Sequence, residues 1–176
     1  GWSMDEGRVL ELLRAVRDEV RVAEPTRAVA SASCHPERHA LNTLTDVQGF
    51  NVYPGWYNSW DGGWDMSNVV RRLFARYPER STLAISEYGA GASATQHDDP
   101  LFRSVPDATP YPEEYQAYLH WGALTALKDN ARVWGVFPWV MFDLAADRRR
   151  EADRHGIKIV MDLVFNHCGS ENFLYR

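Results

Sequence analysis

Glu87 is the residue of this sequence best placed to do chemistry. It ends the apolar run TLAISE (82–87), whose composition predicts a buried strand. The next residues are YGAG (88–91), and two glycines so close together indicate a loop that leaves the carboxylate uncovered. A carboxylate in such a place can act as a nucleophile or as a general acid or base. For a glutamate taken alone, a cap or an ion pair with a nearby arginine is the alternative interpretation.

Further polar and aromatic residues follow the predicted strands. Asn51 and Tyr53 lie at the end of one strand, and Trp139 lies near the end of another. In a barrel of parallel strands the site lies at their carboxyl ends, so these residues are expected near Glu87. The chain also has seven Trp and eight Tyr, whose flat apolar faces and polar groups suit the C–H faces and hydroxyls of a sugar. His97 is a further candidate for contact with a sugar.

The elements needed to position these residues alternate between helix and strand. Apolar residues at helical spacing predict helices at 5–22, 66–77 and 112–128. Strands are predicted at 26–33, 46–53, 82–87 and 133–142. The last strand is apolar on both sides, which is typical of a buried parallel sheet, and Pro138 predicts that it ends or bulges nearby. Ser3 and Glu6 are expected to form a capping box before the first helix.

This alternation predicts an α/β fold with a parallel sheet. A complete (β/α)8 TIM barrel takes ~250 residues, whereas this chain has 176. We therefore expect a partial TIM barrel that carries only the later strands and helices.

Charge and spacing argue against several other classes of protein. The net charge is −5, which does not favour nucleic acid as a partner. No apolar run approaches the ~20 residues needed to span a bilayer. The segment HPERH (35–39) departs from the zinc motif His-Glu-x-x-His and is expected to be a solvated loop. The segment GAG (89–91) lacks the third glycine of a dinucleotide site. The sequence thus implies neither a metal nor an organic cofactor.

Three segments together resemble glycoside hydrolase family 2, which includes β-galactosidases and β-glucuronidases. ISEYGAG (85–91) resembles the nucleophile motif of that family, and GFNVYPGWY (49–57) is similar to its Asn-x-Tyr-x-Gly-Trp-Tyr segment. VWGVFPWVMFD (133–143) resembles its last barrel strand. The three segments occur in the order found in the family. The resemblance covers residues 1–153 and is closest to β-galactosidase-like members.

The resemblance implies a role for each residue of the expected site. Glu87 would be the catalytic nucleophile of a retaining enzyme, and Tyr53 would lie beside it and tune its carboxylate. Asn51 would hydrogen-bond a sugar hydroxyl, and Trp139 would form part of the wall around the terminal sugar. Taken without the motifs, Asn51 would be a turn residue and Trp139 a core aromatic. The implied substrate is a terminal β-linked sugar, with β-galactosides first.

The sequence departs from the family at the second carboxyl group, which retaining hydrolysis needs ~5 Å from the nucleophile. The family places this glutamate after an asparagine, and the sequence contains no Asn-Glu pair. The pair is expected upstream of Gly1, because the helix at 5–22 resembles the one that follows it. Glu113 and Glu114 are poor substitutes, since Pro112 places them in a first helical turn. The acid/base glutamate that turnover needs is therefore expected to be missing from this fragment, and the activity of the fragment alone is left open.

Residues 154–176 are expected to be a separate unit. HGIKIVMDLVFNH (155–167) resembles the first conserved region of the α-amylase family, glycoside hydrolase family 13. By that resemblance Asp162 and Asn166 would be structural or calcium-linked, and His167 would contact a sugar. The catalytic segments of that family are absent, so no amylase activity follows. The segment is interpreted as a fusion or an artefact.

The sequence as a whole predicts a retaining glycoside hydrolase whose partner is a carbohydrate. Two alternatives stay open, namely an α-amylase-like glycosidase and a non-catalytic carbohydrate-binding or truncated fragment. Neither nucleic acid nor a membrane is expected as a partner. The chain shows no signal peptide, and its oligomeric state and its cytoplasmic or periplasmic location are left open.

Overall fold

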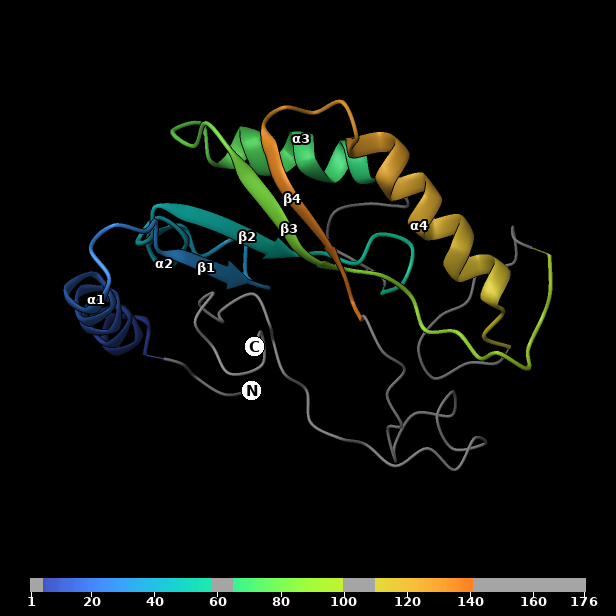
Figure 1. The fold of residues 1–176 in the computed structure, drawn as a ribbon, viewed down its shortest axis with the longest axis horizontal. Coiled ribbons are helices and arrows are strands. Elements are labelled where there is room, and N and C mark those ends of the chain that lie inside the picture. Colours follow the sequence, from blue (N-terminus) through green and yellow to red (C-terminus); the bar gives the residue numbers. More distant parts are fainter. Residues whose placement is uncertain (1–4, 58–64, 100–109, 141–176) are drawn as a thin grey trace.

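A parallel sheet of four strands forms the centre of the structure (Figure 1). The structure is a computed structural model that describes residues 5–57, 65–99 and 110–140. The strands are β1 (Ala30–Ser33), β2 (Val47–Asn51), β3 (Leu83–Tyr88) and β4 (Val133–Pro138). They lie in chain order and each is parallel to the next. The predicted α/β fold with a parallel sheet is confirmed.

Two helices cover one face of this sheet (Figure 1). They are α3 (Met66–Arg76) and α4 (Glu113–Leu127), and both were predicted to within one residue at each end. Val69 and Leu73 of α3 are fully buried in one core with Phe50 of β2 and Ile85 of β3. Alternate residues of a strand face opposite sides of a sheet, so the residues directly before and after Phe50 and Ile85 are expected on the face away from these helices.

The first helix, α1 (Glu6–Ala23), has none of its residues buried. Its apolar stripe stays accessible, with Leu12 63% and Val16 50% exposed. The capping prediction was wrong in its residue: Asp5 is the N-cap, and its carboxylate accepts from the backbone N–H groups of Gly7 and Arg8. Ser3 lies outside the described residues.

A short helix, α2 (His39–Asn42), was not predicted. Four residues are too few for helical periodicity to be visible in a sequence. Asn42 is buried and its amide donates to the Tyr77 hydroxyl at 2.7 Å. His35 lies in a solvated loop as expected, whereas His39 lies in the helix and is ion-paired with Glu79 at 2.9 Å.

The strand predicted at 133–142 ends at Pro138, as that proline suggested. It lies at the edge of the described sheet and is less buried than its composition predicts, with Trp134 46% and Phe137 38% exposed. Its neighbour β3 is the most buried strand, since residues 83–86 are all buried. Within the described ranges no helix is long and apolar enough to cross a membrane.

Candidate active site

The site is organised by an irregularity between β2 and β3. Phe50 pairs with Ile85, but the next residue of β2, Asn51, pairs with Glu87. Strand β3 therefore advances by two residues while β2 advances by one, as in a β-bulge. Such bulges occur next to active sites because they re-aim side chains. The two residues Ser86 and Glu87 thus both lie opposite Asn51.

Glu87 and Tyr53 are brought together as predicted. The Tyr53 hydroxyl donates to Oε2 of Glu87 at 2.8 Å, and both residues are only half-buried. The backbone supports this contact, because Val52 N–H donates to the Glu87 carbonyl at 2.9 Å. An O–H donor aimed at a carboxylate stabilises its negative charge. Tyr57, 39% exposed, lies edge-on to the Tyr53 ring with centroids 5.2 Å apart, so an aromatic surface adjoins the carboxylate.

Asn51 lies beside this pair and is held by Ser86. The Ser86 hydroxyl donates to Oδ1 of Asn51 at 2.7 Å. Ser86 was not singled out from the sequence, although it directly precedes Glu87. Only the register shift identifies Ser86. That shift arises from the pairing of two strands, so neither strand's sequence shows it.

Trp139 is attached to the end of β3 through its backbone. Its N–H donates to the Tyr88 carbonyl at 2.7 Å, and its side chain is half-buried. Gly89 makes this approach possible: a Cβ there would lie 2.6 Å from the Trp139 carbonyl oxygen, and its φ of 153° is unfavourable for other residues. Trp139 is therefore bonded to the residue that follows Glu87 on the neighbouring strand. The sequence placed it near the end of its strand, and the structure has it there. The Trp139–Val140 peptide bond is cis.

His97 is not joined to Glu87 by any contact that the described residues make. It is exposed, and its Nδ1 lies 2.8 Å from Oε1 of Glu114, near the start of α4. The pKa of Glu114 is lowered, first by a hydrogen bond from its own backbone N–H and then by the bond to His97.

His120 of α4 packs beside the strand that carries Glu87. Its ring lies edge-on to Tyr88 with centroids 5.2 Å apart. Burial lowers the pKa of His120, and burial raises the pKa of Tyr88. Both groups are therefore held in their neutral forms near neutral pH.

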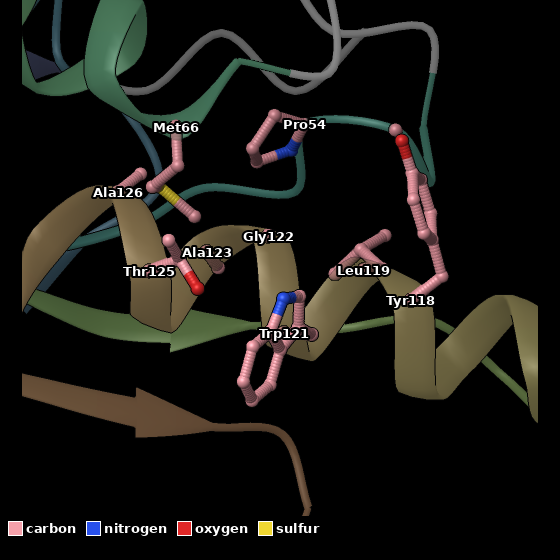
Figure 2. Close-up of a pocket in the computed structure, with 10 residues that line it drawn as sticks. Pro54, Met66, Tyr118, Leu119, Trp121, Gly122, Ala123, Thr125 and Ala126 are labelled. Atoms are coloured by element: carbon pink, nitrogen blue, oxygen red, sulfur yellow. The ribbon is translucent and has the colours of Figure 1, made fainter.

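A separate groove of about 380 Å³ runs along α4 (Figure 2). Its walls include Pro54, Met66, Tyr118 and Trp121, and they are mainly apolar. Asn51, Tyr53 and Glu87 do not line it. The groove is thus distinct from the cluster around Glu87, although Pro54 follows directly on Tyr53.

Within the described ranges no three His, Cys, Asp or Glu side chains gather as they would around a metal ion. Asp143 and the α-amylase-like residues Asp162, Asn166 and His167 lie outside the described residues.

Comparisons with known proteins agree with this fold. No protein-family model matches the chain. A β-glucuronidase of Bacteroides fragilis is 34% identical over 148 residues, which make up 84% of this chain and 21% of that protein. A solved Bacteroides fragilis structure described as a β-galactosidase matches with a TM-score of 0.68 and 27% identity over 81% of this chain and 21% of its own. An FMN-binding β-glucuronidase from Facaelibacterium prausnitzii L2-6 matches with a TM-score of 0.67 and 26% identity over 86% and 22% of the two chains.

The chain spans about a fifth of the length of these relatives. None of the three is an α-amylase, and residues 154–176, on which that resemblance rested, lie outside the described residues. The sheet and its helices correspond to part of the TIM barrel of family 2 glycoside hydrolases, and the relatives of this chain are β-glycosidases of that kind.

Proposed function

We propose that this chain carries the nucleophile side of the active site of a retaining β-glycosidase. The observation that carries the proposal is the 2.8 Å hydrogen bond from the Tyr53 hydroxyl to Glu87, at the carboxyl ends of two neighbouring parallel strands. That end of the strands is where barrel enzymes have their sites. The glycosidase relatives support the same reaction class.

In the proposed reaction a carboxylate oxygen of Glu87 attacks the anomeric carbon of the sugar. The bond from that carbon to the leaving group breaks, the leaving group takes the electron pair, and a glycosyl ester of Glu87 forms with inversion. The Tyr53 hydroxyl holds the attacking carboxylate in one orientation. Asn51 binds a sugar hydroxyl, and Trp139 supplies an apolar wall against the sugar ring.

His97 belongs to the proposal as a residue at the rim of the sugar site. Its Nδ1 faces Oε1 of Glu114 at 2.8 Å, so Nε2 points away from that carboxylate. A contact from Nε2 to a sugar hydroxyl is the role proposed for it.

The proposal for this chain is limited to formation of the glycosyl ester. The sequence contains no Asn-Glu pair of the kind that supplies the acid/base residue in the family it resembles. A leaving group that departs without a proton, such as fluoride, does not need that residue. A fluoride is therefore the substrate type on which this chain is expected to react.

β-Galactosides are the first proposed substrates, and β-glucuronides are the second. The sequence motifs resemble those of β-galactosidase-like proteins, and one solved relative is described as a β-galactosidase. The 34% identical relative is a β-glucuronidase, which favours the second class. The two sugars differ at C6, where glucuronic acid carries a carboxylate, and in the orientation of the C4 hydroxyl.

The test is covalent labelling of the folded chain with 2-deoxy-2-fluoro-β-galactosyl fluoride and with its glucuronyl counterpart. Peptide mapping by mass spectrometry locates the adduct. We expect an adduct on Glu87 that is lost in Glu87→Gln, with faster labelling by the galactosyl reagent. Glu113→Gln is the matched control, because Glu113 is exposed on α4 and is expected to label like the wild type.

Each outcome decides a separate part of the proposal. Faster labelling by the glucuronyl reagent, still on Glu87, would move the substrate assignment to β-glucuronides. An adduct on another carboxylate would overturn the assignment of the nucleophile. No adduct from either reagent, in a chain shown by circular dichroism to be folded, would leave a non-catalytic fragment as the better description.

A further inference from the structure

We propose that Ser86 is a positioning residue that fixes the carboxamide of Asn51 with its NH2 group facing the sugar. The inference rests on the proposed function, since it assigns the donor end of Asn51 to a sugar hydroxyl. It starts from a hydrogen bond of 2.7 Å between the Ser86 hydroxyl and Oδ1 of Asn51.

The register of the sheet makes this contact possible. In a regular parallel pair, the residue after Ile85 would take the place opposite Asn51, and Glu87 would point to the other face of the sheet. Here Asn51 pairs with Glu87 instead, so Ser86 is the extra residue of the bulge and has no pairing partner of its own on β2. The insertion brings the hydroxyl of Ser86 and the carboxylate of Glu87 to the same residue of β2.

Space for Ser86 is provided by Gly49, two residues before Asn51 on the same strand. A Cβ on Gly49 would lie 2.7 Å from Cβ of Ser86 and 2.8 Å from its Oγ. Contacts this short do not occur between real side chains, so any larger residue at position 49 would displace the serine. Ser86 is itself buried, with 9% of its surface exposed. Its hydroxyl is thus confined beside Asn51.

The chemistry of the amide explains why this matters. An asparagine side chain has an acceptor end and a donor end of nearly equal size, and a half-turn about its last bond exchanges them. A hydroxyl that donates to Oδ1 stabilises one of the two orientations and leaves the two N–H groups for another partner. Without it, the acceptor and the donor compete for the position next to the sugar.

The first arm of the test follows the amide itself and needs no reaction. The side-chain 15N–1H signals of Asn51 are assigned in the full chain by their loss in Asn51→Asp. We expect these signals to shift or broaden in Ser86→Ala and to stay in place in Ser93→Ala. Ser93 is a matched control, since it is 3% exposed and its hydroxyl lies near Thr95 rather than Asn51. Asn51 signals that are unchanged in Ser86→Ala would overturn the inference.

The second arm asks whether Ser86 acts through Asn51. The rate constant for labelling of Glu87 by the 2-fluoro sugar is measured in Ser86→Ala, in Asn51→Ala and in the double variant. We expect Ser86→Ala to slow labelling about 3- to 10-fold, as for loss of one hydrogen bond, and to have no further effect once Asn51 is alanine. Ser86→Cys, which keeps the volume and a weak donor, is expected to lie between serine and alanine.

The two arms separate failure of the inference from failure of the proposed function. If the wild-type chain forms no adduct, the proposed function fails, and the Asn51 signals still decide whether Ser86 orients the amide. If the wild-type chain forms the adduct and Ser86→Ala slows it equally with and without Asn51, Ser86 acts by some other route. That additive result would overturn the inference while the proposed function stands.

Discussion

At the scale of single residues, the contact between Tyr53 and Glu87 is the interaction most open to test. Replacing Tyr53 by phenylalanine removes one donor to a carboxylate and leaves the ring in place. The attacking carboxylate then loses the bond that orients it, and misplacement of a reacting group can cost up to about 100-fold in rate, so Tyr53→Phe is expected to slow labelling of Glu87 about 10- to 100-fold. The measurement is the inactivation rate constant with the 2-fluoro sugar. Tyr118→Phe is the matched control, because Tyr118 is 42% exposed on α4.

Equal labelling rates in Tyr53→Phe and the wild type would mean that the hydroxyl does not support the nucleophile. A loss of rate accompanied by a large fall in melting temperature would point to a role in folding instead.

Gly49 gives a second prediction at this scale. The Cβ of Gly49→Ala would lie 2.7 Å from Cβ of Ser86 on the neighbouring strand. Overpacking of this kind costs about 1–3 kcal/mol of the free energy of unfolding. Gly122→Ala is the matched control, since a Cβ on Gly122 meets nothing within 4 Å. Gly122 lies in helix α4, where replacement of glycine by alanine is expected to raise the free energy of unfolding by about 0.5–1 kcal/mol. Urea denaturation of both variants checks the pair, and equal effects would contradict the packing around Ser86.

How much of the site was predictable differs from residue to residue. The sequence singled out Asn51, Tyr53 and Glu87, because strand ends and the order of motifs can be read from a sequence alone. Ser86 was missed because its partner is chosen by a register shift between two strands. The exposed ion pair of His97 with Glu114 was also missed, since it joins a loop to a helix start 17 residues further along the chain.

At the scale of elements, long periodic segments were predicted well and short ones were not. The limits of α3, α4 and β3 agree with the prediction to within one residue, because each has a strong apolar pattern. Helix α2 has four residues and leaves no such pattern. The burial of β4 was overestimated because a sequence shows how apolar a strand is and not whether a neighbour lies on its other side.

The packing of α4 on β3 predicts a dependence of stability on pH. Burial against Tyr88 lowers the pKa of His120 in the folded protein. In the unfolded chain the same ring takes up a proton near pH ~6.5. As the pH falls below that value, the unfolded state binds a proton that the folded state excludes, so the free energy of unfolding decreases. Above it, both states are neutral and His120 contributes no pH dependence.

His120→Gln is therefore expected to weaken the fall in melting temperature between pH 7.5 and pH 5.5. Thermal unfolding followed by circular dichroism at several pH values measures it. Thr125→Gln, a change to a non-titrating and exposed residue of the same helix, is the control and is expected to keep the wild-type slope. An unchanged slope in His120→Gln would show that the ring is solvated in the folded state.

At the scale of the whole molecule, the described structure has one main core and several accessible apolar side chains. The face between the sheet and helices α3 and α4 holds the main core. Apolar side chains are accessible along the stripe on α1, at Trp121 of α4, which is 74% exposed, and at Trp134 of β4, which is 46% exposed. In the described sheet, β1 and β4 are the outer strands. Exposed apolar patches and open strand edges favour association with other chains.

This arrangement predicts that the purified chain associates with itself through α1. Leu12 and Val16 lie one helical turn apart, so they form a continuous patch on one side of the helix. The variant Leu12→Gln/Val16→Gln is expected to shift the chain toward its monomeric mass of 20.1 kDa in size-exclusion chromatography with light scattering. Because both side chains are at least half exposed, the free energy of unfolding should change by less than about 0.5 kcal/mol. Glu19→Gln, on the same helix, is the control that should leave the mass distribution unchanged. A double variant that associates as the wild type does would overturn the prediction that the contact lies on α1, and one that unfolds readily would show that α1 is packed in solution.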